Sequence, residues 1–234
     1  MAQKKLKRFT EIGTFKNVLQ YPPQAAGNWH HHFGNTNPII LELACGRGEY
    51  TVGLSALYPG KNFIGVDIKG NRLWVGAKKA LDKNLSNVAF LRTQIDKIDQ
   101  YFEPGEVAEI WITFPDPQLR GSKAKKRLTH PKFLRLYKKF IQEGGMIHLK
   151  TDSPDLYEFT KLVARVYDLT IISDLADLYK NEDLPQDLHI KTHYEILDIA
   201  GSNTIFYLAF SLPEILNEQD EEFTALLKYQ LNEA

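Results

Sequence analysis

Cysteine is almost absent from the 234-residue sequence, in which Cys45 is the only one. No disulfide can therefore form within the chain, which fits a reducing compartment, and we expect a cytoplasmic protein. Long hydrophobic runs are also missing, because no stretch approaches the roughly 18 apolar residues of a membrane span. The first residues, MAQKKLKRFTEIG, lack the apolar stretch of a secretory signal. We therefore expect a protein that neither spans a membrane nor is exported.

The sequence also lacks net charge, since 29 basic residues balance 29 acidic ones. A nucleic-acid partner would have to be met by a local basic patch. Two basic clusters without acids are present, namely Lys4, Lys5, Lys7 and Arg8, and Arg120, Lys123, Lys125, Lys126 and Arg127. The compensating acids gather elsewhere, chiefly within residues 214–222 and 174–187. Charge is thus segregated along the chain, although its sum is zero.

Internal repeats are absent, and 43% of the residues are hydrophobic, enough for one sizeable core. Short apolar runs alternate with helix-like stretches, which is the rhythm of βαβ units. The predicted strands are 39–44, 62–67, 88–92, 109–114, 146–150, 169–173 and 205–211, and the predicted crossover helices are 49–57, 70–84, 131–141 and 154–167. The pattern predicts an α/β fold of parallel strands with helices on both faces.

One domain with appended ends is expected. Residues 1–36 form a basic N-terminal extension, residues 37–213 the α/β domain, and residues 214–234 an acidic C-terminal helix. That helix carries Phe223 and three leucines on one face, so we expect it to pack on the same domain. Residues 174–190 are polar and are expected to form a long loop.

Two glycines, Gly46 and Gly48, follow the first predicted strand and precede a helix. Glycine at such a turn lets a ligand approach the backbone closely. Asp67 ends the next strand, where a doubly wound fold places an acid against ribose hydroxyls. These features together predict a nucleoside site.

The glycine loop lacks the motifs of dinucleotide and nucleoside-triphosphate sites, which limits the kind of nucleoside ligand. A dinucleotide site would have a third glycine where this chain has Thr51, and no G-x-x-x-x-G-K-[ST] motif is present. Glu42, which precedes the turn, would repel a pyrophosphate but would suit a cation. S-adenosylmethionine carries an ammonium and a sulfonium group. The residues therefore favour S-adenosylmethionine over NAD or a nucleoside triphosphate.

A series of short motifs follows at and after the fourth predicted strand. Phe114-Pro115-Asp116-Pro117 precedes the second basic cluster, and Arg127-Leu128-Thr129-x-Pro131-x-Phe133-Leu134 comes after it. Further motifs are Trp29, Phe33-Gly34-Asn35, Lys150-Thr151-Asp152 and Thr192-His193-Tyr194-Glu195. In this order they resemble the tRNA (guanine-N7)-methyltransferase family. The resemblance implies a Rossmann-like, seven-stranded methyltransferase sheet, and methyl transfer from S-adenosylmethionine to N7 of guanine 46 in the variable loop of tRNA.

The resemblance also implies roles for single residues on the cofactor side. Glu42 would bind the methionine part of the cofactor and Asp67 its ribose. Gln94 would contact the adenine, where the family usually has an acid, and Asp96 is an alternative. Asp116 would be catalytic, at the place where cofactor and guanine meet.

On the substrate side, the residues that would bind the target nucleotide are Arg120, Asp152, Thr192 and Glu195. Asp152 and Glu195 would accept the N1 and N2 protons of guanine. The RNA phosphates would be bound by Lys123, Lys125, Lys126 and Arg127, and the segment from Lys4 to Arg8 would extend that contact.

Two departures from the family pattern stand near the site. Gln118 replaces a common Trp, which changes how a base is stacked, and Ala44 replaces a usual glycine. Neither alters the expected chemistry. N7 of guanine has a lone pair and the sulfonium is an activated leaving group, so the site mainly has to align two atoms and exclude water.

tRNA is the expected partner, with no obligate protein partner, and the chain is expected to be a monomer or homodimer. His189 and His193 have i, i+4 spacing without a third ligand, so we predict no metal site. One alternative is methylation of an exocyclic base amino group, whose enzymes carry Asn/Asp-Pro-Pro-aromatic where this chain has Gln118 after Pro117. The other is a non-catalytic RNA-binding module on the same fold.

Overall fold

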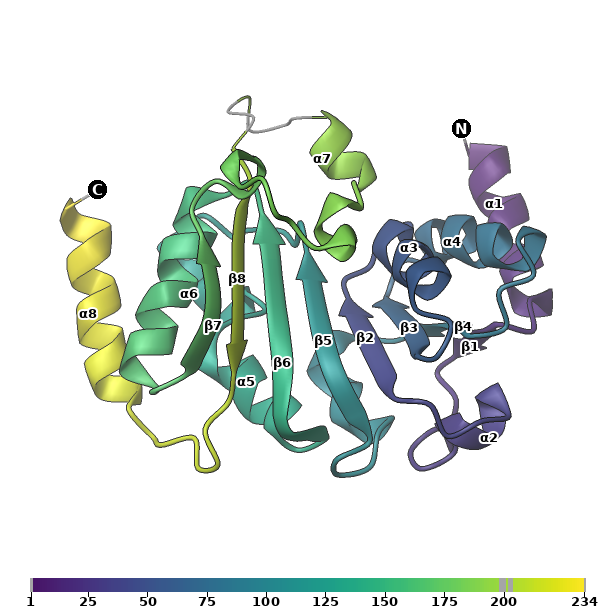
Figure 1. The fold of residues 1–234 in the computed structure, drawn as a ribbon, viewed down its shortest axis with the longest axis horizontal. Coiled ribbons are helices and arrows are strands. Elements are labelled where there is room, and N and C mark those ends of the chain that lie inside the picture. Colours follow the sequence, from purple (N-terminus) through teal and green to yellow (C-terminus); the bar gives the residue numbers. More distant parts are fainter. Residues whose placement is uncertain (1, 198–200, 202–203, 234) are drawn as a thin grey trace.

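The computed structural model describes residues 2–197, 201 and 204–233, with side chains for residues 6–229 within those ranges. Its centre is a sheet of eight strands in the order β1-β4-β3-β2-β5-β6-β8-β7 (Figure 1). All neighbouring pairs are parallel except those made by β8. The strands are β1 (Val18–Gln20), β2 (Ile39–Leu43), β3 (Asn62–Asp67), β4 (Val88–Arg92), β5 (Val107–Thr113), β6 (Ile141–Thr151), β7 (Thr170–Leu175) and β8 (Phe206–Ser211).

Helices cover both faces of this sheet, as predicted. They are α1 (Ala2–Glu11), α2 (Trp29–Phe33), α3 (Glu49–Leu57), α4 (Gly70–Asp82), α5 (Pro131–Lys138), α6 (Pro154–Val166), α7 (His193–Leu197) and α8 (Asp220–Glu233), and the short 3₁₀ turns are Ile12–Thr14, Ile95–Gln100, Gly121–Lys126, Leu178–Lys180 and Gln186–His189. The core residues of α5, α6 and α8 belong to one apolar cluster, whereas those of α3 and α4 belong to two others.

The central strands are buried on both faces, which explains their almost continuous apolar sequence. In β2, Leu41 and Leu43 enter the cluster shared with α5 and α6, whereas Ile40 enters the cluster shared with α3. Side chains alternate between the two faces because the strand repeat is two residues. A strand such as Ile39–Leu43 can therefore be apolar at nearly every position and still serve two cores.

The sheet has eight strands rather than the seven expected. The additional strand, β1, lies in the basic N-terminal extension and pairs in parallel with β4. Ile12 and Trp29, on either side of β1, are buried, so the part of the N-terminal extension around β1 packs into the fold. Three residues are too few to show a strand period, and only the edge of β4 makes them a strand.

The ends of some elements differ from the prediction, and the largest difference among the strands is in β6, which begins at Ile141 rather than 146. Helix α5 ends at Lys138 rather than 141, because Ile141 starts β6 and pairs with Val107. Its N-cap is His130, whose Nδ1 accepts a hydrogen bond from the Lys132 N–H at 3.0 Å. Helix α6 has Ser153 as its N-cap, and the Ser153 Oγ accepts a hydrogen bond from the Leu156 N–H. The segment predicted as one long loop contains the end of β7 and two 3₁₀ turns.

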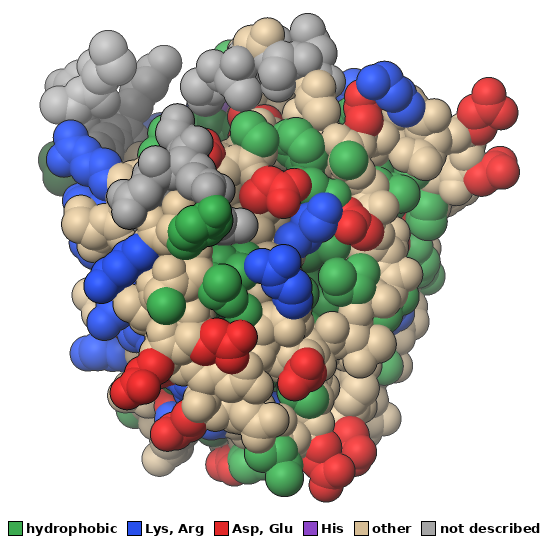
Figure 2. All heavy atoms as spheres, turned by 90° about the vertical axis from the view of Figure 1, so that its left-hand side faces the viewer, with side chains coloured by type: hydrophobic (Ala, Val, Ile, Leu, Met, Phe, Trp, Pro, Cys, Tyr) green, Lys and Arg blue, Asp and Glu red, His purple; other side chains and the backbone are tan. Residues whose placement is uncertain are grey.

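The C-terminal helix α8 begins at Asp220, six residues later than predicted. Phe223 is buried, and its ring lies 5.7 Å from that of Phe159 and 5.9 Å from that of Tyr167. Figure 2 shows the side formed by α8 and β7, where acidic side chains gather along the lower part. None of the helices in the described ranges has the length and apolar character to cross a membrane.

Candidate active site

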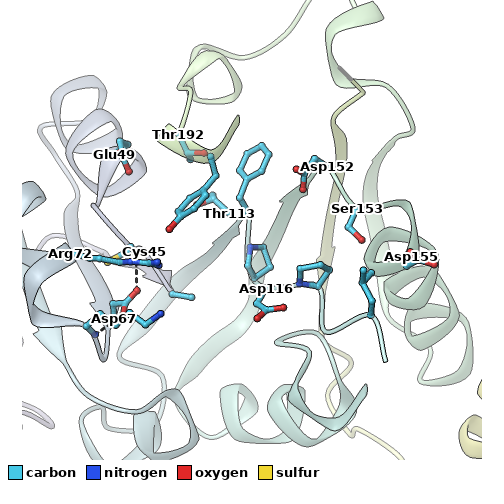
Figure 3. Close-up of a pocket in the computed structure, with 18 of the residues that line it drawn as sticks. Cys45, Glu49, Asp67, Arg72, Thr113, Asp116, Asp152, Ser153, Asp155 and Thr192 are labelled. Atoms are coloured by element: carbon cyan, nitrogen blue, oxygen red, sulfur yellow. Dashed lines mark hydrogen bonds between the residues drawn. The ribbon is translucent and has the colours of Figure 1, made fainter. Parts of the chain in front are cut away.

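A cleft of about 700 Å³ opens at the carboxyl ends of the central strands (Figure 3). In open α/β sheets this end is where ligands bind. The cleft is lined by the loop after β2, the end of β3, the start of α4, the loop after β5, the start of α6 and the residues around the start of α7. Among the residues predicted for the site, Gly46, Asp67, Asp116, Asp152 and Thr192 all line it.

Asp67 holds the glycine loop in place. Its Oδ2 accepts a hydrogen bond from Gly46 N–H at 3.0 Å, and its Oδ1 accepts one from Lys69 N–H at 2.7 Å. Ala44, Gly46 and Gly48 have φ values of 54°, 57° and 68°, so the loop turns through three left-handed positions. The carboxylate that was predicted to meet ribose hydroxyls therefore also orders the loop beside it.

Gly48 has a packing role and does not line the cleft. A Cβ at Gly48 would lie 2.5 Å from a ring carbon of Phe90. On α4, a Cβ at Gly76 would lie 2.5 Å from the carbonyl oxygen of Arg47. The close contact between helix and loop that a third loop glycine provides in dinucleotide sites is provided here by Gly76.

Glu42 lies behind the cleft wall. Its Oε2 accepts hydrogen bonds from the N–H and hydroxyl of Thr51, and its Oε1 accepts one from Thr113 Oγ1 at 2.8 Å. Burial raises the pKa of Glu42 to about 7, although these hydrogen bonds oppose the shift. Thr113 lines the cleft and Glu42 does not, so the carboxylate is one hydrogen bond removed from a ligand there.

The cleft also contains residues that were not predicted for the site, among them Glu49, Lys69, Arg72 and Tyr194. Glu49 is the first residue of α3 and directly follows Gly48, and this position next to the glycine loop could have indicated from the sequence that Glu49 lines the cleft. The Arg72 guanidinium lies 5.6 Å from the centre of the Tyr194 ring. Because the cleft contains both charge signs beside Asp67, it could hold the ammonium and carboxylate of an amino acid.

A second cavity of about 580 Å³ adjoins the cleft, with Ala44 and Asp67 common to both linings. Gln94 and Asp96 line it, together with apolar side chains such as Ile95 and Phe133. Asp96 forms an ion pair with Lys132, whereas the side chain of Gln94 is a neutral amide. The apolar side chains and the Gln94 amide suit a purine ring, and the lining also contains Thr93 and three lysines. The two cavities therefore fit S-adenosylmethionine as a whole.

Asp116 lies on a constrained loop after β5. Phe114 and Gln118 have φ values of 47° and 49°, which non-glycine residues rarely adopt. Asp116 Oδ1 accepts a hydrogen bond from Gln118 N–H at 3.0 Å. In Figure 3 the Asp116 side chain lies between that of Asp67 on one side and those of Asp152 and Asp155 on the other.

Arg127 supports this loop from beneath. Its Nε donates to the Pro117 carbonyl at 3.1 Å and its Nη2 to the Gln118 carbonyl at 3.3 Å. The guanidinium lies 4.4 Å from the centre of the Phe159 ring, and the residue is only 3% exposed. Burial lowers the pKa of Arg127. A side chain so enclosed does not reach a phosphate, which differs from the expectation for Arg127.

The other basic residues of the cluster are exposed. Arg120, Lys123, Lys125 and Lys126 lie in or beside the 3₁₀ turn Gly121–Lys126. Lys125 and Lys126 also line the second cavity, but Arg120 lines neither. In the first cluster, Lys7 and Arg8 are described, whereas the side chains of Lys4 and Lys5 lie outside the described residues.

Glu195 does not line the cleft either. Its carboxylate forms a 3.1 Å ion pair with Lys150 and accepts a hydrogen bond from the Tyr179 hydroxyl. The structure thus brings Asp116, Asp152 and Thr192 together but directs Glu195 away from them. Within the described part of the chain, no group of three His, Cys, Asp or Glu side chains is arranged to hold a metal ion.

Comparison with known proteins places this geometry in a family. Residues 36–208 match the model of a family described as "Putative methyltransferase". The chain is 45% identical to a tRNA (guanine-N(7)-)-methyltransferase of Bacteroides thetaiotaomicron, with 95% of this chain and 92% of the relative covered. It is 50% identical to one of Porphyromonas gingivalis, with 86% of each chain covered.

The chain belongs to the tRNA (guanine-N7)-methyltransferase family.

Solved structures show the same fold. A 16S rRNA methyltransferase, KamB, has a TM-score of 0.61 at 14% identity, covering 84% of this chain and 99% of that one. A SAM-dependent methyltransferase from Aquifex aeolicus has a TM-score of 0.52 at 13% identity, covering 88% and 97%. At such low identity these likenesses concern the fold alone.

This member of the tRNA (guanine-N7)-methyltransferase family departs from the family pattern at Gln118 and Ala44. Both residues occupy left-handed positions, and Gln118 is held through its carbonyl by Arg127. The next residue, Leu119, lines the cleft and is exposed. An apolar surface therefore remains beside the cleft despite the missing Trp.

Proposed function

We propose that this protein transfers a methyl group from S-adenosylmethionine to N7 of a guanine in tRNA, in the cytoplasm, and that the guanine is the one at position 46. One observation carries the proposal. Asp67, Asp116 and Asp152 line a single cleft in a chain 45% identical to a tRNA (guanine-N(7)-)-methyltransferase over 95% of its length. Residues 37–213 would form the catalytic domain, with both ends of the chain packed on it.

The cofactor would lie across the two adjoining cavities. Asp67 would accept hydrogen bonds from ribose hydroxyls while keeping the loop at Gly46 in place. Gln94 would hold the adenine edge, since Asp96 is engaged by Lys132. Glu49 and Arg72 would meet the ammonium and carboxylate of the methionine part, and Glu42 would act through Thr113.

Catalysis would rest on alignment and electrostatics rather than on proton removal. The bound cofactor supplies a methyl group already activated by its sulfonium. Asp116 and Asp152 present carboxylates from two sides of the cleft, and they would stabilise the positive charge that methylation places on the base. Asp152 would also accept a hydrogen bond from an N–H group of the guanine edge. Thr192, from the opposite wall, would complete the pocket for the base.

RNA would be held by the exposed cations around the Gly121–Lys126 turn. Arg120, Lys123, Lys125 and Lys126 would contact phosphates, which gives an affinity that falls with salt. These contacts would position the RNA without reading its sequence, whereas the cleft would select the guanine.

The test is incubation of unmodified tRNA with methyl-labelled S-adenosylmethionine, followed by nucleoside analysis. We expect label in 7-methylguanosine, and no label when guanine 46 of the transcript is replaced by adenine. Asp116→Asn should abolish transfer while S-adenosylmethionine binding persists. Asp82→Asn, an exposed acid of α4 paired with Lys78, is the matched control and should behave as wild type. Label found only on N2 of guanine or on adenine would refute the proposal.

A further inference from the structure

Lys150 is a completely buried cation near the end of β6. Its side chain is 0% exposed, and its strand lies between β5 and β8 in the sheet. The amine lies within hydrogen-bond distance of the Leu188 and Ile190 carbonyls, both at 3.0 Å, and of the Tyr179 hydroxyl at 3.2 Å. All these partners belong to residues 176–192, which join β7 to α7.

The charge of Lys150 is balanced by Glu195, at 3.1 Å, whose side chain is 4% exposed. Burial lowers the pKa of Lys150, and the Glu195 carboxylate opposes that shift. An isolated charge at such a site would cost several kcal/mol, so each member depends on the other. Glu195 Oε1 accepts a hydrogen bond from the Tyr179 hydroxyl, whereas Oε2 accepts no hydrogen bond and is paired only with the Lys150 ammonium.

Helix α7 has few other attachments. None of its five residues is classed as buried, and its aliphatic residues Ile196 and Leu197 are 68% and 53% exposed. Apolar packing therefore does not hold α7 on the domain. Thr192, just before the helix, is buried and accepts a hydrogen bond from the Glu195 N–H at 3.1 Å. The Lys150–Glu195 pair is thus a direct link between α7 and the sheet.

The same short segment forms one wall of the cleft. Thr192 and Tyr194 line the cleft on either side of His193. The Tyr194 ring faces Arg72, and it lies 3.9 Å from where a Cβ of Gly46 would stand. A shift of α7 would therefore move both side chains relative to the ligand.

We infer that Lys150 is a positioning residue, which with Glu195 locks α7 over the cleft so that Thr192 and Tyr194 face the substrates. Glu195 then acts on the reaction through Lys150, as its counter-ion. This inference rests on the proposed function for its kinetic consequence. The lock itself is a property of the protein without substrates.

A double-mutant cycle on methyl transfer tests the role of Glu195. Lys150→Met and Glu195→Gln should each lower kcat by about tenfold or more, because either leaves an unpaired buried group and releases α7. The affinity for tRNA, set by exposed lysines, should be retained, which separates positioning from loss of fold. Lys150→Met/Glu195→Gln should be no slower than the slower single variant. If Glu195 acted on guanine independently of Lys150, the two losses would multiply, and that result would overturn the inference.

Hydrogen exchange of the α7 amides tests the lock without activity. Exchange should be faster in both single variants than in wild type, and wild-type exchange in them would refute the lock. Glu195→Gln lies outside the sheet and keeps this test available if Lys150→Met does not fold. The matched control is Lys180→Met, which removes the cation of an ion pair with Asp177 in the same segment. Lys180 is 83% exposed, so exchange and kcat should stay unchanged. Failure of the wild type to methylate tRNA would refute the proposed function and leave the exchange result to decide the lock.

Discussion

Replacing Arg127 by Met removes the support beneath the Asp116 loop while keeping an unbranched apolar side chain. The guanidinium makes two hydrogen bonds, at 3.1 Å to Pro117 and 3.3 Å to Gln118, and stacks on Phe159. Hydrogen bonds to a charged group contribute about 1.5–3 kcal/mol each. Both distances are long, so we take the lower value, which gives a loss of about 3 kcal/mol.

If that energy holds Asp116 in place, kcat should fall by about 100-fold, since 1.36 kcal/mol corresponds to a factor of ten. Single-turnover methylation of tRNA with saturating cofactor measures this loss. Arg127→Lys should be intermediate, because a lysine keeps one donor but loses the planar stack. Because Arg127 is buried, the salt dependence of tRNA binding should not change in either variant.

The matched comparison is the double variant Lys125→Ala/Lys126→Ala, which removes two exposed cations from the same cluster. It should weaken tRNA binding and lower the slope of log K against log salt by about two, with little effect on kcat at saturation. Wild-type kcat in Arg127→Met together with a reduced salt slope would refute the reasoning, because Arg127 would then be a phosphate contact.

Further predictions concern the cofactor half of the site. Gly76→Ala should lower the free energy of unfolding in urea by about 1–2 kcal/mol, since its Cβ would meet the Arg47 carbonyl, whereas Gly60→Ala, with open space around it, should not. Burial raises the pKa of Glu42 from 4.5 to about 7 in the folded protein. The contribution of Glu42 to the free energy of unfolding should therefore be greatest below about pH 4.5 and should be lost as the pH rises to about 7. Glu42→Gln should flatten that pH profile in thermal denaturation, and an unchanged profile would contradict the assignment. Asp67→Ala should weaken S-adenosylmethionine binding by about tenfold or more in calorimetry, because two loop N–H groups lose their acceptor.

The local sequence pattern was enough to predict the central strands and the helices between them. Strands β3 and β4 and helix α3 have the bounds read from the sequence, because buried β-branched runs and glycine turns are signals that lie within a few neighbouring residues. The order of motifs was enough for the family, and Asp67 was assigned to the cofactor cleft from its place at a strand end. The three-residue strand β1 had no such signal.

Side-chain partners were decided only by the tertiary structure. Glu42 and Glu49 flank the same turn, yet strand alternation and burial turn Glu42 toward Thr113 and leave Glu49 in the cleft. Arg127 is one residue from the exposed Lys126, but packing on Phe159 makes it a support for a loop. The sequence by itself determined the central strands, the glycine loop and the family, because these depend on neighbours along the chain. Segments that are far apart in sequence decide which acids face a ligand and which face a buried cation, because these segments meet only in the folded protein. Lys150 and Glu195 are an example.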